Sequence, residues 1–327
     1  MTKGYRLGGI SMVLVMWTLG FFYVSSVSGD GLELHFYRNS CSNAEMIVKE
    51  LMKPIILTDT TTSAALLRLA FHDCQVDGCD ASVLLRDVEG SSRMETESDK
   101  NFGVRKLETI DMIKTRLEEH CPQTVSCTDI IQLAAREAIY QKGGPYIEVL
   151  TGRRDSYSAS RERADNQLPL ANISTDDCIQ IFRQKNISLE QGVALLGAHT
   201  LGITHCRNIN ERLRPASDPT LSPTYSLGLQ TICSNPLLSD TTFSGNDATP
   251  ITFDNHYFTD IQNGRGLLKI DSEIARDPRT MPFVIHFGRD KKLFFDRFSS
   301  AFLKLSSLNV LVGEDGEVRR DCKYRNS

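Results

Sequence analysis

The stretch LLRLAFHDCQVDGCDASVLL, residues 66–85, combines an apolar helical pattern with a dense group of polar side chains. Arg68 and His72 are four positions apart, and residues at i and i+4 of an α-helix lie on the same face. We therefore expect the guanidinium and the imidazole to project into one space. A permanent cation beside a group that titrates near neutrality is suited to a site where a proton moves and negative charge develops. The alternative is a structural pair held by backbone carbonyls.

The turn that follows this pair is rich in oxygen ligands and contains Gly78. Its hard oxygen donors are Asp73, Asp77, Asp80 and Ser82. Calcium prefers oxygens of carboxylates, hydroxyls and backbone carbonyls, so the turn is a candidate calcium site. An acidic turn that is merely solvated is the alternative. Cys74 and Cys79 bracket the turn and could lock it.

The N-terminus has the layout of a secretory signal peptide. Basic residues precede an apolar stretch at 7–24, and small residues follow at 25–29. We expect residues 1–29 to be removed and residues 30–327 to form the mature domain. A membrane anchor is the alternative reading of the same stretch.

Composition and charge exclude some classes of partner. The chain is 40% hydrophobic and 24% charged, which is ordinary for a globular protein. Removing Lys3 and Arg6 with the signal peptide leaves 35 basic and 41 acidic residues, a net charge of 35 − 41 = −6. No second apolar run is long enough to span a bilayer. We therefore expect no nucleic-acid partner and no membrane association.

The nine cysteines predict disulfides, because a signal peptide sends the chain through an oxidising compartment. Zinc binding is the weaker alternative, since no CxxC pair occurs. An odd count leaves one free thiol, and spacing alone does not give the pairing. Asn172 and Asn186 each begin an N-glycosylation sequon, which fits a secreted chain.

Helical periodicity dominates the rest of the chain. Apolar residues recur at helical spacing in residues 43–55, 60–73, 104–119, 126–141, 175–184 and 189–201. Residues 146–151 are the clearest strand and predict a short ribbon. Ser188 and Gln191 form a capping box that starts the last of these helices and brings His199 to its end. His199 alone could equally be a satisfied core residue. We expect one mainly α-helical domain, in two lobes.

Six motifs occur in order along the chain. They are RLAFHDC (68–74), DGCDASVLL (77–85), TVSCTDI (124–130), GGPYIEVLTGRRD (143–155), LLGAHTLGITHC (195–206) and TFDNHYF (252–258). Together they resemble the secretory plant haem peroxidases, the class III family, from about Phe36 to Cys322. The resemblance implies a mainly α fold in which two helical lobes enclose haem b, with a short β ribbon.

On the distal side of the haem, the resemblance implies that Arg68, His72 and Asn101 are catalytic. His72 would transfer the proton of the peroxide, and Arg68 would stabilise the charge on the departing oxygen. Asn101 is the candidate for the asparagine that hydrogen-bonds the distal histidine. Phe71 would lie beside the haem, and Pro169 would lie at the substrate channel.

On the proximal side, the resemblance makes His199 the axial ligand of the iron and Asp271 its hydrogen-bond partner. A carboxylate partner makes the imidazole more anionic and favours cleavage of the O–O bond. The implied enzyme reduces hydrogen peroxide to water. It then oxidises small phenolic donors in two one-electron steps through ferryl haem intermediates, as in lignin or suberin coupling, peroxide removal or stress response.

The resemblance also implies two calcium ions and four disulfides. The distal ligands would be Asp73, Val76, Gly78, Asp80 and Ser82, with Glu95 binding through water. The proximal ligands would be Thr200, Thr249, Thr252 and Asp254, completed by either Asn246 or Asp247. The disulfides would be Cys41–Cys121, Cys74–Cys79, Cys127–Cys322 and Cys206–Cys233. Cys178 would be the free thiol, a small buried residue rather than a reactive group.

The expected protein is a monomer that is exported to the cell wall or extracellular fluid rather than the vacuole. Its partners would be hydrogen peroxide and small phenols. An intracellular ascorbate-type peroxidase is the alternative enzyme, which the signal peptide and the cysteines disfavour. A calcium-stabilised wall protein without efficient catalysis is the alternative outside enzymes, which Arg68, His72, His199 and Asp271 disfavour. The single tryptophan, Trp17, lies in the signal peptide, so the mature chain has no surface-tryptophan route for oxidising bulky donors.

Overall fold

The computed structural model describes Met1, residues 31–86 and residues 93–326. Apart from Met1, the predicted signal peptide, including Trp17, lies outside the described residues. The described part is mainly α-helical, as predicted, with thirteen α-helices and one two-stranded sheet.

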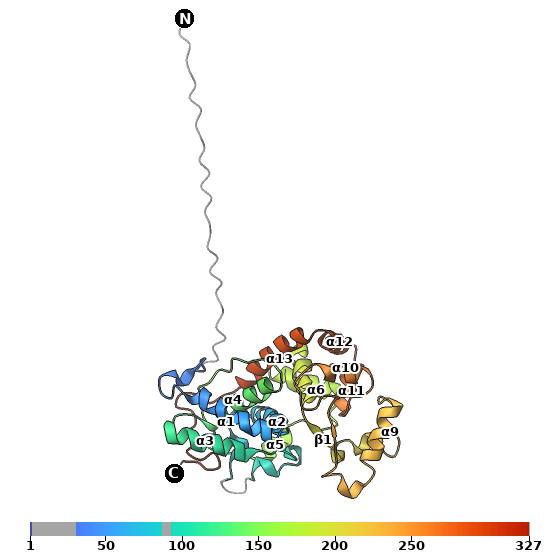
Figure 1. Cartoon of the computed structure of the whole chain (residues 1–327), viewed down its shortest axis with the longest axis horizontal. Helices are drawn as coiled ribbons and strands as arrows, with labels where there is room; N and C mark the ends of the chain where they lie inside the picture. Colours follow the sequence, from blue (N-terminus) through green and yellow to red (C-terminus); the bar gives the residue numbers. More distant parts are fainter. Residues whose placement is uncertain (2–30, 87–92, 327) are drawn as a thin grey trace.

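The first four helices form what we call the N-terminal lobe (Figure 1). They are α1 (Ala44–Thr58), α2 (Thr62–Gln75), α3 (Leu107–His120) and α4 (Cys127–Gln141). Helix α4 is the central element, since α1, α2 and α3 all pack against it. Every residue of α4 from Cys127 to Ile139 is buried.

The C-terminal lobe is built around a second group of helices (Figure 1). Its helices are α6 (Thr175–Gln184), α7 (Leu189–Leu196), α10 (His256–Gln262), α11 (Lys269–Ile274) and α12 (Met281–Arg289). Helices α8 (Asn210–Leu213) and α9 (Pro223–Ile232) also belong to this lobe, and α9 lies at its outer edge. Helix α5 (Arg161–Gln167) lies near α2 and contacts the 3₁₀ turns at 95–97 and 99–101.

Helix α13 (Lys291–Ser306) connects the two lobes, because it packs against α7 and α12 and also contacts α2. Phe294, Phe298 and Phe302 recur every four residues along it and are buried. Phe253 adds a stacked ring, with centroids 5.7 Å from Phe294. The aromatic side chains of α13 therefore form a core of the C-terminal lobe, on the helix that also contacts α2.

The six helices predicted from periodicity are present. The last one is shorter than expected: α7 ends at Leu196, and a 3₁₀ turn, Gly197–Thr200, carries His199. Tightening of a last helical turn is common where carbonyls lose their α-helical partners. The predicted capping box of Ser188 and Gln191 is confirmed at the start of α7.

The predicted strand at residues 146–151 is wrong. Its only ladder contact is a bridge between Thr151 and Glu33. The chain beyond it is held by buried side chains instead: Gly152 N–H donates to Asp129 at 2.6 Å, and the Arg153 guanidinium donates to the Leu150 carbonyl at 2.6 Å. The ribbon is formed elsewhere, by β1 (Ile203–His205) and β2 (Phe243–Gly245), which pair antiparallel.

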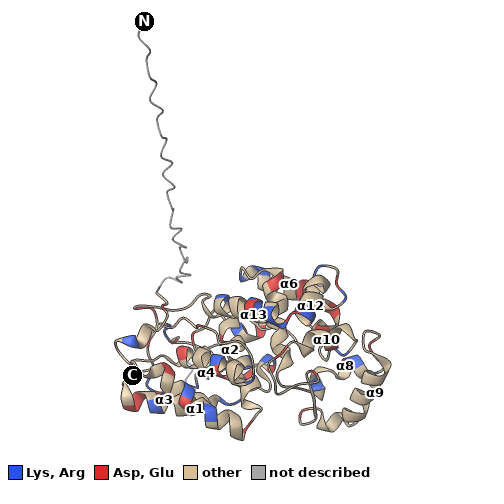
Figure 2. Cartoon of the chain, turned by 45° about the horizontal axis from the view of Figure 1, so that its top comes forward, with Lys and Arg blue, Asp and Glu red and all other residues tan. Residues whose placement is uncertain are grey.

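Four disulfides join the pairs implied by the resemblance. They are Cys41–Cys121, Cys74–Cys79, Cys127–Cys322 and Cys206–Cys233. Cys178 is free and buried. Lysines and arginines are interspersed with acidic residues over both lobes (Figure 2). Within the described ranges, no helix combines the length and the apolar character needed to cross a membrane.

Candidate active site

A cavity of about 700 Å³ lies between the two lobes. Arg68, Phe71 and His72 line it from α2, and His199 lines it from the C-terminal lobe. Much of the remaining wall is apolar, including Leu67, Ala70, Leu195, Leu268 and Ile270. The cavity thus brings together two histidines that are far apart in the sequence.

Both ring nitrogens of His72 are engaged. Nδ1 donates to the side-chain oxygen of Asn101 at 2.7 Å, and Arg68 Nε donates to His72 Nε2 at 3.0 Å. An amide oxygen only accepts and a guanidinium only donates, so the proton is assigned to Nδ1. Burial lowers the pKa of His72 to about 3, with a further contribution from the Arg68 charge and opposition from the Asn101 hydrogen bond. The imidazole is therefore neutral at ordinary pH, with a basic lone pair on Nε2.

Asn101 and Arg68 are themselves held in place by backbone groups. Asn101 is buried, and its Nδ2 donates to the Glu95 carbonyl at 2.7 Å. Arg68 Nη1 donates to the Phe102 carbonyl at 2.9 Å. Burial, followed by the nearby Arg105 charge, lowers the pKa of Arg68 to about 10, which leaves it charged at neutral pH.

On the other side of the cavity, His199 Nδ1 donates to Asp271 Oδ1 at 2.9 Å. The Leu268 N–H donates to Asp271 Oδ2 at 2.9 Å, at the start of α11. The carboxylate thus fixes the orientation of the imidazole and leaves Nε2 of His199 as the ring nitrogen that could bind a metal.

Two groups at the site were not found from the sequence. The first is Tyr257, whose hydroxyl donates to Asp271 Oδ1 at 2.8 Å. It lies within the motif TFDNHYF, yet no residue spacing indicates its contact with a carboxylate in α11.

The second is a set of neighbouring side chains in and beside the cavity wall that we call the aromatic rim: Phe102, His205, Phe243 and Arg207. The His205 ring is 5.4 Å from Phe102 and 6.2 Å from Phe243 between centroids, edge to face in both cases. The Arg207 guanidinium lies 4.2 Å from the Phe102 centroid. All but Phe243 line the cavity, and Phe243 is half-exposed. The register of β1 with β2 sets His205 opposite Phe243, a pairing that the sequence did not indicate. Pro169 also lines the cavity.

The predicted distal calcium ligands lie in the last turn of α2 and in the segments that follow it, and Asp73, Asp80 and Glu95 are buried. Asp73 Oδ1 and both carboxylate oxygens of Glu95 have no hydrogen-bond partner. Burial raises the pKa of Asp80 to about 6 and that of Glu95 to about 8, and it raises the pKa of Asp73 well above its usual range. Such a set of buried, unpartnered oxygens fits a hard cation.

The same turn depends on Gly78, whose φ is +143° and whose position would bring an added Cβ within 2.4 Å of the Asn309 carbonyl. Among the described residues, no three His, Cys, Asp or Glu side chains are grouped closely enough to hold an ion by themselves. The predicted distal set accordingly relies on carbonyl and hydroxyl oxygens as well.

The predicted proximal calcium ligands also converge. Thr200 Oγ1 donates to Asp247 Oδ2 at 2.7 Å and approaches Asp254 Oδ1 at 3.3 Å. Thr249 Oγ1 lies 3.2 Å from Asp254 Oδ1, and the Thr252 carbonyl lies 3.4 Å from Thr200 Oγ1. Asp247 therefore belongs to this cluster.

Asn246 is engaged elsewhere. Its side chain accepts from Thr204 Oγ1 at 2.8 Å and donates to the Leu201 carbonyl at 3.0 Å. Burial raises the pKa of Asp247 to about 6. Of the two residues left open by the sequence, the geometry favours Asp247.

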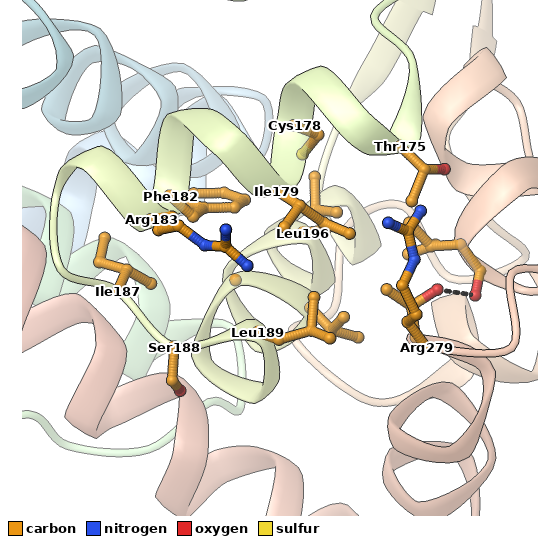
Figure 3. A pocket seen from close by; sticks show the side chains of 14 residues that line it. Thr175, Cys178, Ile179, Phe182, Arg183, Ile187, Ser188, Leu189, Leu196 and Arg279 are labelled. Carbon is orange, nitrogen blue, oxygen red and sulfur yellow. Dashed lines mark hydrogen bonds between the residues drawn. The ribbon is translucent and has the colours of Figure 1, made fainter.

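A smaller pocket of about 260 Å³ lies between α6 and α7 (Figure 3). Cys178, Phe182 and Leu196 line both this pocket and the central cavity, so they form part of the wall between them. Burial, followed by the Asp271 charge, raises the pKa of the Cys178 thiol to about 12. A thiol in this state is a poor nucleophile, as expected for a small buried residue.

The family model described as Peroxidase matches residues 47–290. The chain is 44% identical to Peroxidase 29 of Arabidopsis thaliana over 304 residues, covering 90% of this chain and 89% of the relative. It is 40% identical to Peroxidase 21 of Arabidopsis thaliana, covering 94% of this chain and 95% of the relative. Peroxidase 63 of the same plant is 38% identical and is matched over its full length.

The fold and the two-histidine cavity define an oxidoreductase of the haem peroxidase type. The family match and the identities over most of the chain show that this protein belongs to the plant peroxidase family. It is a peroxidase that consumes hydrogen peroxide.

Proposed function

We propose that the central cavity binds haem b and that His199 is its axial ligand. One observation supports this proposal most directly: His72 and His199, from different lobes, line the same cavity. In each ring, Nδ1 donates a hydrogen bond to a side-chain oxygen. This arrangement leaves Nε2 of His199 for a metal and Nε2 of His72 for a proton. A haem bound here would supply the redox chemistry that splits the O–O bond and withdraws electrons from a donor.

His72 moves the proton in this proposal. Its neutral Nε2 takes the proton from one oxygen of hydrogen peroxide and delivers it to the other oxygen as that oxygen leaves as water. Since Nε2 has a single lone pair, its hydrogen bond from Arg68 has to open first. The freed guanidinium then stabilises the negative charge on the departing oxygen.

Small phenols are the proposed donors, and each gives one electron per encounter. Pro169 and the aromatic rim are at the cavity. Partly exposed rings offer edge and face contacts to an aromatic donor. Phe71 in the cavity wall restricts how deeply a donor can enter.

Two calcium ions complete the proposal. The distal ion would be held by Asp73, Asp80, Ser82 and the carbonyls of Val76 and Gly78, with Glu95 acting through water. The proximal ion would be held by Thr200, Thr249, Thr252, Asp254 and Asp247. Both turns adjoin a proposed functional histidine, since Asp73 follows His72 and Thr200 follows His199.

We also propose that residues 1–29 are a signal peptide and that residues 30–327 are secreted to the cell wall as a monomer. The disulfides support passage through an oxidising compartment. N-terminal sequencing and sizing of protein secreted by plant cells test this. An N-terminus at Met1, or a dimer, would contradict it.

The experiment for the catalytic assignment combines an absorption spectrum with stopped-flow kinetics. Wild type is expected to show a Soret band that changes on mixing with peroxide. His72→Ala should keep the band but slow this change by about 10²–10⁴-fold, the usual contribution of a positioned base. His256→Ala is the matched control, since His256 is exposed at the start of α10. A fast peroxide reaction in His72→Ala would overturn the assignment. Purified protein that binds no haem would support the wall-protein alternative.

A further inference from the structure

One oxygen of Asp271 accepts two hydrogen bonds. His199 Nδ1 donates to Oδ1 at 2.9 Å, and the Tyr257 hydroxyl donates to the same atom at 2.8 Å. Tyr257 and Asp271 are 1% and 2% exposed, so water does not compete for this oxygen. The Tyr257 ring also meets the His199 ring edge to face, with centroids 5.9 Å apart.

Two donors on one oxygen share its negative charge. A hydrogen bond from Tyr257 therefore weakens the pull of the carboxylate on the His199 proton. Tyr257 is a dependable donor, because burial and the Asp271 charge hold its pKa well above the usual value. The hydroxyl is the donor in this pair, because a carboxylate oxygen accepts.

We propose that Tyr257 is a positioning residue that sets the strength of the Asp271–His199 hydrogen bond and, through it, the electron donation of His199 to the iron. The inference rests on the proposed function, in which His199 holds a haem. Tyr257 touches neither substrate nor iron in this scheme and acts only through Asp271.

The sign of the effect follows from the charge on the imidazole. Without the Tyr257 hydroxyl, Asp271 Oδ1 has only His199 to bind, so the imidazole becomes more anionic. A more anionic axial ligand stabilises ferric over ferrous iron. The hydroxyl of Tyr257 therefore holds the reduction potential higher than His199 and Asp271 alone would give.

The test is Tyr257→Phe, which removes one oxygen and keeps the ring. Two readouts other than turnover are measured on the haem-loaded protein: the ferric–ferrous midpoint potential by spectroelectrochemistry, and the Fe–His stretching band of the ferrous form by resonance Raman. We expect the ferric–ferrous equilibrium to move toward ferric by up to about tenfold, where tenfold corresponds to about 59 mV for one electron. We expect the Fe–His band to move to higher frequency.

A second variant makes the opposite change. Replacement of Tyr257 by 3,5-difluorotyrosine keeps the hydroxyl and makes it a stronger donor, so the potential should rise and the Fe–His band should fall. This variant decides the question even if Tyr257→Phe does not fold. Opposite shifts support the inference, whereas an unchanged band and potential overturn it.

Tyr37→Phe is the matched control. Tyr37 is also buried, and its hydroxyl donates to a buried aspartate, Asp129, at 2.6 Å in the N-terminal lobe. Its removal should cost stability without changing the potential or the Raman band. A shift as large in Tyr37→Phe would mean that general loosening is responsible, which contradicts the role of Tyr257. If wild type shows no Fe–His band at all, the proposed axial ligand fails instead.

Discussion

Asn101 holds His72 by a hydrogen bond of 2.7 Å from the ring Nδ1, and the same amide donates to the Glu95 carbonyl at 2.7 Å. The proposed base is therefore tied to the segment that carries a proposed calcium residue. Two properties follow for His72: a fixed tautomer and a fixed ring orientation.

Asn101→Ala should slow the reaction with peroxide by about 10-fold to 100-fold, the usual effect of losing such a supporting partner. The physical reason is that nothing then keeps the proton on Nδ1 and the lone pair on Nε2. Stopped-flow mixing with peroxide measures the effect. Asn255→Ala is the matched control, because Asn255 donates to the Phe287 and Gly288 carbonyls instead. Equal rates in wild type and Asn101→Ala would show that the contact is dispensable.

The pH dependence should follow the pKa of His72, which burial and Arg68 lower to about 3. The peroxide rate should stay level from pH 8 to about pH 4 and fall only near pH 3. The pKa of His72 is lower in the folded protein than in the unfolded chain, where it is about 6.5. Between pH 6.5 and pH 3 the unfolded chain therefore binds a proton at His72 that the folded protein does not. Stability is greatest above pH 6.5 and is lost as the pH falls from 6.5 toward 3. Unfolding of wild type and His72→Leu across this range should show wild type losing stability faster on acidification. A rate that halves near pH 6.5 would contradict this prediction.

Calcium removal should destabilise the protein and slow the peroxide reaction. Without a cation, the buried Asp73 and Glu95 carboxyls must either take up protons or repel one another as charges, and both cost stability. Bound calcium at 100 times its Kd would stabilise the fold by about 2.7 kcal/mol. Treatment with a chelator should lower the Tm, and restored calcium should reverse it. Asp80→Ala should reduce this response, whereas Asp315→Ala, at an exposed position, should not. An unchanged Tm on chelation would rule out structural calcium.

The adjacent residues Asn246 and Asp247 allow a direct test of the proximal site. Asp247 accepts from Thr200, while Asn246 is engaged with Thr204. Asp247→Ala should reduce the calcium content measured by atomic spectroscopy from two ions to one per chain, and Asn246→Ala should leave two. The reverse result would transfer the ligand role to Asn246.

Substitutions in the aromatic rim should change the kinetics with phenolic donors and not the reaction with peroxide. Phe243→Ala removes a half-exposed ring that meets His205. Loss of one aromatic contact, worth about 1 kcal/mol, should raise the KM for a phenol such as guaiacol about fivefold. The rate of the peroxide step should not change. Leu237→Ala is the control, because Leu237 is also an exposed apolar side chain but does not belong to the aromatic rim. Identical donor kinetics in the two variants would exclude the rim as a docking surface.

Helices long enough for several turns were predictable from periodicity, as α1 to α4, α6 and α7 show. Helices α8 and α11 span only four and six residues, too few for a repeat to emerge. Helix α13 was missed despite its phenylalanines at 294, 298 and 302, which are spaced as a helix requires. The segment at 146–151 was mistaken for a strand because buried side chains, and not a neighbouring strand, satisfy the backbone that follows it.

At the site, i to i+4 spacing was enough to place Arg68 beside His72. The approach of Asn101 to His72, 29 positions away, and of Asp271 to His199, 72 positions away, came only from resemblance. Neither residue spacing nor the resemblance indicated the role of Tyr257, because its contact with Asp271 depends on how α10 packs against α11.

The disulfide between Cys127 and Cys322 spans 195 positions. During biosynthesis, Cys322 therefore becomes available to Cys127 only after most of the domain has left the ribosome. Cys121 lies close by and would be a competing partner, but its own partner, Cys41, is already available upstream. Early oxidation of the Cys41–Cys121 pair would remove the competitor and keep Cys127 for the late ring closure. The positions of these cysteines thus make the Cys41–Cys121 pair available for oxidation before the Cys127–Cys322 pair.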